Sequence, residues 1–569
     1  MAVDINKLNQ RYQALRTERS PWDTAWQSLA DHFLPTKFRA DTDSSERKPE
    51  LLNKRLVDAT GILDMRTLAA GLQGGMTSPV RPWFRLTLED EDAAQAPDAG
   101  AWLDEVTRRM QALLHRSNFY NAVHGLYGDL GTFGVGCMME TADWSGLHFR
   151  TIPCGEYVID TDDNGSVDTL MYRLRMSARQ IVQRFGETVV PDAVKTAAAN
   201  SGAGVTTFFD VIHAIFPRSE RAYGKLGGSA MPWASVWWLG FGTVGGGKPC
   251  LLRESGYRDF PAFCPRWDVT GNDKYGRSPA MDVLPNVRML QQMGGTILKG
   301  THKAVDPPMV APAGLRGAGV DLTPGGVNWM STNGLETGKV EPVQQVQAQI
   351  LVAAEQKVQA VQQSVHDGLF ADLFKMLMLN DRRQITATEI DAREREKLIL
   401  LGPVVERLDK ELLSPAVMRT YSLMEQYDFL PPPPETVSGA SLRVQFVSVL
   451  AQAQRLSQTS PIDQTLAFAA NVAQADPTVL DILDTGVAMR EYAEALGAPA
   501  AMLRSEQDVQ QIRQARAQAQ QEAQQQAQMQ AAQQAAVDLS GAAKNLGQTP
   551  LGADGQTAMD AIIGGLGGM

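Results

Sequence analysis

The fold is decided by two long helical stretches, PAMDVLPNVRMLQQMGGTILKGTHKAV (residues 279–305) and PVQQVQAQILVAAEQKVQAVQQSVHDGLFADLFKMLML (residues 342–379). The first is preceded by Ser278 and begins with Pro279, which together form a typical helix start. Pro285 is expected to bend or restart this helix, because it lacks the N–H that an interior helical residue donates.

The second stretch carries an apolar stripe along one helical face. Its members recur at steps of three, four and four, at Val358, Val361, Val365 and Leu369. At about 1.5 Å per residue, a helix over 342–379 would be about 55 Å long. Residues 306–340 between the two helices are rich in Gly and Pro, with a strand-like patch, VNWM. We therefore expect a protruding hairpin with a small β/turn tip, whose two rods must stand beside identical copies to bury their apolar stripes.

The N-terminal third is expected to be helical and then to change to strands. Helical spacing marks residues 52–72, the region from Trp102 to Leu113, and a helix predicted to start at Ser20-Pro21. Between Cys137 and Tyr257 the pattern becomes that of strands separated by Asn-Gly and Gly-Gly turns. The predicted strands are 147–152, 156–160, 169–176, 208–216 and 234–241. One helix should interrupt them, since Ser177 and Gln180 form a capping box. The fold class is therefore α+β, with an antiparallel β domain among helices.

The C-terminal part is expected to be helical. Thr386 and Glu389 form a second capping box, and a PPPP run at 431–434 precedes a helical region over 440–504. Residues 505–540 are rich in Gln and Ala, with good helix propensity but almost no apolar stripe. We expect a helix there that frays or is ordered by like helices beside it, and disorder after 540.

Composition limits the classes of function. The chain has 569 residues and a net charge of −11, with 44% hydrophobic residues, so it is globular and a poor candidate for tight, sequence-specific DNA binding. It has no apolar run that could cross a membrane and no signal peptide at its N-terminus, which predicts folding in the cytoplasm. Its four cysteines lack metal-ligand spacing and are expected to be reduced thiols: Cys137, Cys154, Cys250 and Cys264.

Motifs for catalysis are weak. GTVGGGKP (242–249) matches a phosphate-binding loop as far as Lys248, but Pro249 stands where a magnesium-binding hydroxyl is needed, so a hairpin turn is favoured. The acidic run Glu89–Asp92 is expected to be a solvated loop and not a metal site. The seven histidines form no recognisable nucleophile motif, although triads assemble in space. We expect no cofactor, no metal and no enzymatic activity.

Four stretches resemble one family, the head-to-tail connecting (portal) proteins of short-tailed bacteriophages. They are GMTSPVRPWFRL (75–86), SNFYNAVHGLYGDLGTFGVGCMMET (117–141), NDKYGRSPAMDVLPNVRML (272–290) and QITATEIDAREREKLILLGPVVERL (384–408). The resemblance extends to about residue 430, and its last two stretches are the most specific.

The resemblance implies a portal architecture with an α/β wing, a two-helix stem, a small β/turn clip, a helical crown and a C-terminal barrel helix. In this numbering it implies a wing at 1–275 with its β domain at 137–257, stem helix 1 at 276–305, a clip at 306–340, stem helix 2 at 341–378, a tunnel loop at 379–386, wing helices at 387–435, a crown at 436–504, a Gln/Ala-rich barrel helix at 505–540 and a flexible tail at 541–569.

The function implied is a channel for DNA. Portal proteins form a homo-dodecamer at one capsid vertex, through which double-stranded DNA is packaged and ejected. The implied partners are the terminase, the major capsid protein and a tail adaptor protein, and the implied location is the virion, after assembly in the host cytoplasm. Two other classes remain open: a different ring-forming head–tail adaptor, and a DNA-packaging enzyme.

Simple geometry agrees with a large ring. Twelve helices about 10 Å apart lie on a circle roughly 38 Å across and leave a bore of about 28 Å, whereas six leave about 9 Å. A bore of the larger size admits duplex DNA. The estimate favours large rings without fixing the number at twelve.

Two groups of residues are candidates for DNA contact. The tunnel loop holds Asn380, Asp381, Arg382, Arg383 and Gln384, and its mixed charge would keep each phosphate contact weak. The alternative is an arginine pair that bridges neighbouring subunits. On stem helix 1 the second group is Lys299, His302 and Lys303, which either line the bore and touch phosphates without reading bases or form a solvated outer face. In the same helix Gly294-Gly295 permits either close subunit packing or a kink.

Overall fold

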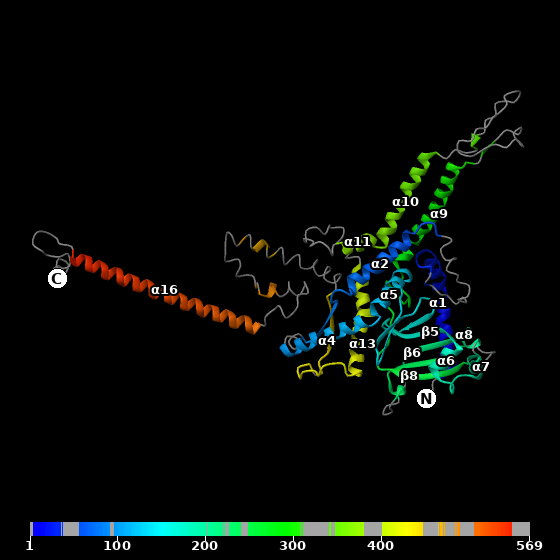
Figure 1. Ribbon diagram of the computed structural model, residues 1–569, viewed down its shortest axis with the longest axis horizontal. Coiled ribbons are helices and arrows are strands. Elements are labelled where there is room, and N and C mark those ends of the chain that lie inside the picture. The colour runs from blue at the N-terminus through cyan, green and yellow to red at the C-terminus, as the bar shows by residue number, and fades with distance from the viewer. Residues whose placement is uncertain are drawn as a thin grey trace, which may run out of the picture. The chain divides into compact units, whose positions relative to one another are not determined.

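The structure is a computed structural model that describes most of the chain, in two units, Met1–Asp484 and Thr485–Met569 (Figure 1). The described residues are 4–35, 37, 56–90, 96–200, 202–219, 221, 227–240, 249–307, 309–310, 341–342, 347–379, 401–437, 439–447, single residues and short runs between 465 and 489, and 506–548. Helices and antiparallel strands are mixed, which confirms the α+β class.

Four helices make up most of the N-terminal region: α1 (Ile5–Phe33), α2 (Thr60–Met76), α4 (Pro97–Arg116) and α5 (Phe119–Phe133). The predicted start of a helix at Ser20-Pro21 is wrong. α1 begins after Asp4, whose carboxylate accepts hydrogen bonds from two backbone N–H groups of the first turn, and it runs through Pro21. The proline removes one helical hydrogen bond, and the burial of apolar residues on both sides of it outweighs that loss.

The predicted antiparallel β domain is present, but as two sheets: the predicted strand over 147–152 lies in a smaller sheet, and a strand that was not predicted, over 250–257, completes a five-stranded sheet. Its order is β4 (Tyr157–Thr161), β5 (Val167–Ser177), β6 (Phe208–Pro217), β7 (Trp233–Leu239) and β8 (Cys250–Tyr257). The N-terminal half of α1 packs Leu8, Tyr12 and Leu15 against one face of this sheet. The short helices α6 (Ala178–Phe185), α7 (Asp192–Ala199) and α8 (Ala203–Thr206) follow β5. The capping box at Ser177 is confirmed, since both of its hydrogen bonds are present.

Two smaller sheets join distant parts of the chain. β2 (Met138–Asp143) pairs with β3 (Gly146–Thr151) and with β9 (Ala262–Phe263). β1 (Phe84–Leu88) pairs antiparallel with β12 (Leu442–Phe446). The expectation that helix begins at 440 is therefore wrong at its start. Leu442, Val444 and Phe446 alternate with polar residues, as a half-buried strand requires, and they pack against the main core.

The predicted helical hairpin is present, with one correction. α9 (Pro279–Val305) starts at the Ser278 cap and continues through Pro285, and β10 (Met309–Val310) pairs antiparallel with β11 (Glu341–Pro342). The returning arm is two helices, α10 (Ala348–Gly368) and α11 (Ala371–Leu379), and not the single helix expected over 342–379. Phe370 adopts a left-handed φ of 54° between them, which turns α11 onto the body.

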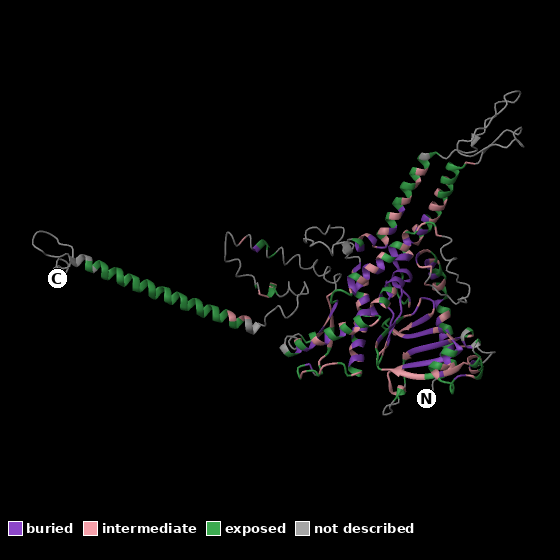
Figure 2. Cartoon of the chain, viewed as in Figure 1, coloured by how far each residue is buried: buried purple, intermediate pink, exposed green. Residues whose placement is uncertain are grey.

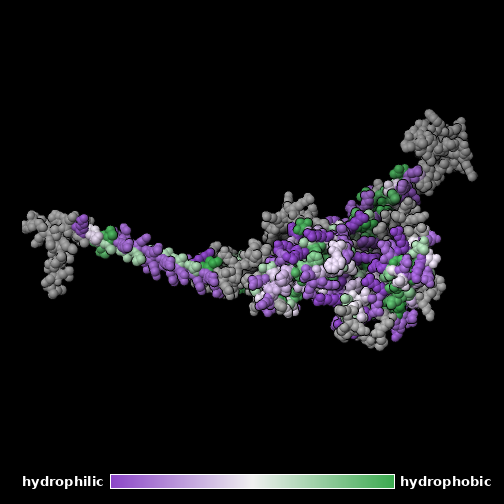
Figure 3. Space-filling model, turned by 60° about the horizontal axis from the view of Figure 1, so that its bottom comes forward, coloured by the Kyte–Doolittle hydropathy of each residue, from purple (hydrophilic) through white to green (hydrophobic). Residues whose placement is uncertain are grey.

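The remaining described segments are helical. Residues 401–408 continue through a π-helical turn, η6 (Asp409–Leu413), into α13 (Ser414–Gln426). In the second unit, α16 (Glu506–Gln548) is a 43-residue helix with exposed, mainly hydrophilic side chains (Figures 2 and 3). The predicted Gln/Ala helix is confirmed, but its expected end at 540 is wrong because the helix continues through Gly541. No helix among the described residues is long and apolar enough to cross a membrane.

Candidate functional site

The arms of the hairpin are packed together at its base. A side chain on Gly368 would approach Val283 to 2.3 Å, so glycine is needed where α10 meets α9. Beside it, the Asn286 amide donates a hydrogen bond to the Ser364 hydroxyl at 2.9 Å. Fully buried residues are confined to this lower part, and the upper turns of both helices hold only exposed and partly buried residues (Figure 2). We call the α9–α10 hairpin the stem.

Apolar side chains remain exposed on the upper stem. Leu298 and Val305 on α9 are 53% and 81% exposed, and Ile350 and Val352 on α10 are 59% and 55% exposed. Single exposed apolar residues are ordinary, but four on one narrow two-helix projection are typical of a surface that another chain covers. The stem alone therefore leaves apolar surface that neighbouring copies could bury.

Two glutamines fasten the stem to the segment before α2. The Gln291 side-chain oxygen accepts hydrogen bonds from the N–H groups of Val57 and Asp58 at 2.7 and 3.0 Å, and its amide donates to the Asp58 carbonyl at 2.7 Å. From the other arm, Gln362 donates to the Asp58 carboxylate at 3.0 Å. These contacts hold both stem helices to one short segment.

A close polar contact joins the same arm to α2 itself. His366 Nδ1 lies 2.6 Å from the Asp64 carboxylate, which is buried. Burial raises the pKa of Asp64, while the neighbouring His366 acts in the opposite direction. The sequence held no signal for this attachment, because the partners are 302 residues apart.

α11 is packed closely against α2 at one glycine. A Cβ on Gly71 of α2 would lie 2.2 Å from the ring of Phe374, so only glycine lets the two helices approach this closely. Phe374 is fully buried in the main core. α11 ends at Leu379, directly before the predicted tunnel loop, so this contact sets where that loop begins.

The predicted DNA-contact residues are only partly within the structure. Lys299, His302 and Lys303 are exposed on the last two turns of α9. Asn380, Asp381, Arg382, Arg383 and Gln384 lie outside the described residues.

Gly294 and Gly295 of α9 differ in the space beside them. A side chain on Gly294 would meet Val57 at 3.2 Å, whereas one on Gly295 would have nothing within 4 Å. Gly295 is thus the glycine that leaves room for a neighbouring molecule.

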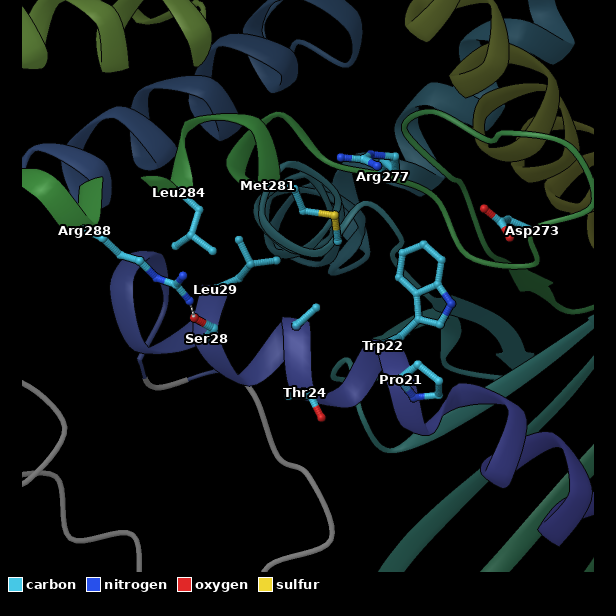
Figure 4. Close-up of a pocket in the computed structure, with 11 residues that line it drawn as sticks. Pro21, Trp22, Thr24, Ser28, Leu29, Asp273, Arg277, Met281, Leu284 and Arg288 are labelled. Carbon is cyan, nitrogen blue, oxygen red and sulfur yellow. Dashed lines mark hydrogen bonds between the residues drawn. The ribbon is translucent and has the colours of Figure 1, made fainter. Parts of the chain in front are cut away.

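A pocket of about 710 Å³ lies at the base of the stem, between α1 and α9 (Figure 4). Trp22 and Leu29 of α1 face Met281 and Leu284 of α9 across it. Three charged side chains lie around this apolar lining: Asp273, Arg277 and Arg288. Arg288 donates a hydrogen bond to the Ser28 hydroxyl. The sequence analysis missed this site, although Met281, Leu284 and Arg288 have the spacing of one helical face.

One buried cluster pairs a histidine with a serine, as a catalytic triad does, but has a tyrosine in place of the triad's acid. His213 Nδ1 lies 2.9 Å from the Tyr172 hydroxyl, and its Nε2 lies 2.8 Å from the Ser235 hydroxyl. All three side chains are buried in the five-stranded sheet, and the His213 ring stacks on Trp237 with centroids 3.8 Å apart. Burial lowers the pKa of His213 well below its usual value. A substrate cannot reach this network, so its role is to satisfy polar groups inside the sheet.

No other feature of the described residues supports catalysis. β7 and β8, which flank the glycine-rich segment at 242–249 in the chain, pair antiparallel, and residues 242–248 of the segment lie outside the described residues. Among the described residues, no three His, Cys, Asp or Glu side chains are grouped so that they could hold a metal ion. Cys137 and Cys264 are free thiols 3.6 Å apart in the core.

Comparison with known proteins places the chain in a family. Residues 5–503 match the bacteriophage head to tail connecting protein family. A probable portal protein of Bordetella phage BPP-1 is 35% identical over 510 residues, covering 89% of this chain and 90% of the relative. The portal protein of Salmonella phage epsilon15 is 35% identical over 519 residues, covering 90% and 91%. The portal protein of Escherichia phage T7 is 23% identical over 71% of this chain and 72% of its own length. The chain belongs to the head to tail connecting protein family.

Proposed function

We propose that this chain is a portal protein, a structural component of the virion that forms a dodecameric ring at one capsid vertex. The observation that carries the proposal is the similarity, over about nine-tenths of the chain, to two phage proteins named as portal proteins. The stem supports it independently, because its exposed apolar residues need neighbours that the described part of the chain does not supply.

The ring would act as a channel and a docking platform. DNA would pass along the axis during packaging and ejection, and the terminase, the tail adaptor protein and the major capsid protein would bind the ring at its ends and rim. In this assignment the α9–α10 hairpin is the stem, residues 306–340 would be the clip, and the crown expected over 436–504 would follow β12. A barrel role for α16 accords with its exposed surface, since a helix with so little apolar stripe is stabilised best by like helices beside it.

The DNA contacts would come from two levels of the channel. Arg382 and Arg383 follow α11, whose position the body fixes through Phe374. Lys299, His302 and Lys303 stand on α9 and would present a cationic ring in twelve copies. Both groups would bind phosphates without reading bases, so the duplex can slide past them.

A complementation experiment tests this function. Heads assembled without this chain should lack packaged DNA, and supply of the wild-type protein should restore DNA-filled heads. The double variant Arg382→Ala, Arg383→Ala should still enter heads but should package or retain little DNA, because it has lost the phosphate contacts of the loop. The amount of DNA per head, measured on particles purified by density, is the readout.

The matched control is Arg108→Ala, which changes an exposed arginine on α4. It should leave packaging unchanged. DNA-filled heads in the complete absence of the chain would contradict the portal function, whereas full packaging by the double variant would exclude only the role of the loop.

A further inference from the structure

Two buried cysteines lie opposite each other on neighbouring strands, where the chain enters and leaves the five-stranded sheet. β2 pairs antiparallel with β9, with Met138 opposite Phe263. Cys137 and Cys264 are the next pair in this register, and their Sγ atoms are 3.6 Å apart. The strands β4 to β8 all lie between these two cysteines in the chain. The close contact therefore joins the two ends of the segment that forms the sheet.

The backbone around the two cysteines has the hydrogen-bond pattern that brings cross-strand side chains closest together. Beside them, the Gly136 N–H donates to the Pro265 carbonyl at 3.1 Å, whereas the Cys137 carbonyl accepts a hydrogen bond from Ile152, after β3, at 2.9 Å. The cysteines are thus a non-hydrogen-bonded pair of the β2–β9 ladder. The Cα atoms of such pairs are about 4.5 Å apart, within the range of about 4.4–6.8 Å that a disulfide spans.

We propose that Cys137 and Cys264 are an oxidation site, which closes to a disulfide when the protein meets a peroxide. The two sulfur atoms need to approach each other by about 1.5 Å to reach the S–S bond length of about 2.05 Å. Cys264 is 4% exposed and Cys137 is 0% exposed, so a small oxidant reaches Cys264 first. Burial raises the pKa of the Cys137 thiol, and the reaction should be slow because the thiolate is the nucleophile.

The reaction consumes one peroxide for each pair of thiols. The Cys264 sulfur attacks one peroxide oxygen, the O–O bond breaks, and one water leaves with the thiol proton, so Cys264 becomes a sulfenic acid. The Cys137 sulfur then attacks the Cys264 sulfur. The S–O bond breaks, and the second water leaves with the proton of Cys137. The two sulfurs together lose two electrons, and the peroxide gains them.

The disulfide would fasten a weakly paired strand. β9 has two residues and lies at the edge of its sheet, and it is flanked by Pro261 and Pro265, which have no N–H to donate. A bond there restricts the unfolded chain over the whole segment between the cysteines, which are 127 positions apart. A reducing cytoplasm would keep both thiols. A virion outside the host would meet oxidants, a step that rests on the proposed function.

Thiol counting on the purified wild-type protein tests the site. Untreated protein, unfolded for the assay, should show four free thiols, and protein first held for hours with dilute hydrogen peroxide should show two. Peptide mapping without a reductant should find Cys137 joined to Cys264. The oxidised protein should also melt about 4 °C or more above the reduced protein.

Two variants separate this site from general oxidation. Cys250→Ser removes a partly exposed thiol on β8, and it should lose the same two thiols as the wild type. Cys264→Ala should lose neither Cys137 nor Cys154, and Cys137→Ala serves if that variant melts early under reducing conditions.

Three results would overturn the assignment. They are four remaining thiols after the treatment, a bridge that includes Cys154 or Cys250, and a Cys264 oxidised without a bridge. A disulfide that forms but leaves the melting temperature unchanged would refute its fastening role. None of these readouts requires a ring, so a failure to form rings would bear on the proposed function alone.

Discussion

Replacing Gly71 by alanine is expected to destabilise the protein and to displace α11 from α2. The added Cβ would lie 2.2 Å from the Phe374 ring and 2.5 Å from the Phe374 Cβ. Rotation of the Phe374 ring does not move the Phe374 Cβ, so it cannot relieve the clash between that atom and the new Cβ. The backbone of α11 must therefore move. Overpacking of a buried contact costs about 1–3 kcal/mol, and we expect the melting temperature to fall by about 2–6 °C.

A matched control lies one turn further along the same helix. Gly74 is exposed, and a side chain there meets nothing within 4 Å. Gly74→Ala should therefore raise stability by up to about 1 kcal/mol through helix propensity alone. Combining Gly71→Ala with Phe374→Ala should cost less than the sum of the two single changes, because the clash with the Phe374 ring is removed and only that with its Cβ remains. A Gly71→Ala protein as stable as Gly74→Ala would contradict the proposed contact.

The same change should also affect function. α11 ends at Leu379, directly before the loop that we propose touches DNA. If α2 positions that loop through Phe374, then Gly71→Ala should lower packaging in the complementation experiment, whereas Gly74→Ala should not.

Replacing Glu140 by glutamine is expected to stabilise the protein at neutral and alkaline pH. Glu140 is fully buried on β2. One carboxylate oxygen accepts a hydrogen bond from the Thr420 hydroxyl at 2.7 Å, and the other has no hydrogen-bond partner. Burial raises the pKa of this carboxyl to about 7, although Arg419 and Thr420 act to lower it. An uncharged amide of the same shape removes the cost of ionising this group inside the protein.

The pH dependence has a defined sign. Below about pH 4.5 the carboxyl is protonated in the folded and the unfolded chain, so it contributes no difference. Between about 4.5 and 7 the unfolded chain loses the proton first, and the free energy of unfolding falls as the pH rises. Above about pH 7 the ionised carboxyl lowers the free energy of unfolding by its full amount, about 3 kcal/mol. Glu140→Gln should therefore melt higher than the wild type at pH 8 and at the same temperature near pH 4.5.

An exposed glutamate gives the comparison. Glu406→Gln removes the ion pair with Lys410 on the surface, and we expect almost no change in the melting temperature, since exposed ion pairs contribute little to stability. If Glu140→Gln and Glu406→Gln shifted the melting temperature at pH 8 equally, the buried carboxyl would not carry the pH dependence.

Local patterns in the sequence predicted the elements well. The Ser278 cap, the capping box at Ser177 and the alternating strands of the β domain are all present, since each depends on residues a few positions apart. The break in the second stem arm was missed because Phe370 takes a left-handed φ that no local pattern signals. The break between α10 and α11 is favoured by tertiary packing, because it lets Phe374 fill the space left by Gly71.

The site was predicted less fully than the fold. The exposed cations of α9 were found from their spacing, but the pocket at its base requires α1 and α9 to meet, and they are more than 240 residues apart in the chain. β12 was missed for a related reason: its alternating pattern is short, and its partner β1 lies more than 350 residues earlier in the chain. Contacts between distant segments carry little signal in a single sequence.

A class-averaged top view of the purified protein by electron microscopy, with no nucleotide present, is the most direct measurement. If neighbouring copies cover the exposed apolar side chains of the stem, the protein should form closed particles with a central hole and twelve repeating units. Monomers that persist at every salt and protein concentration would contradict the account.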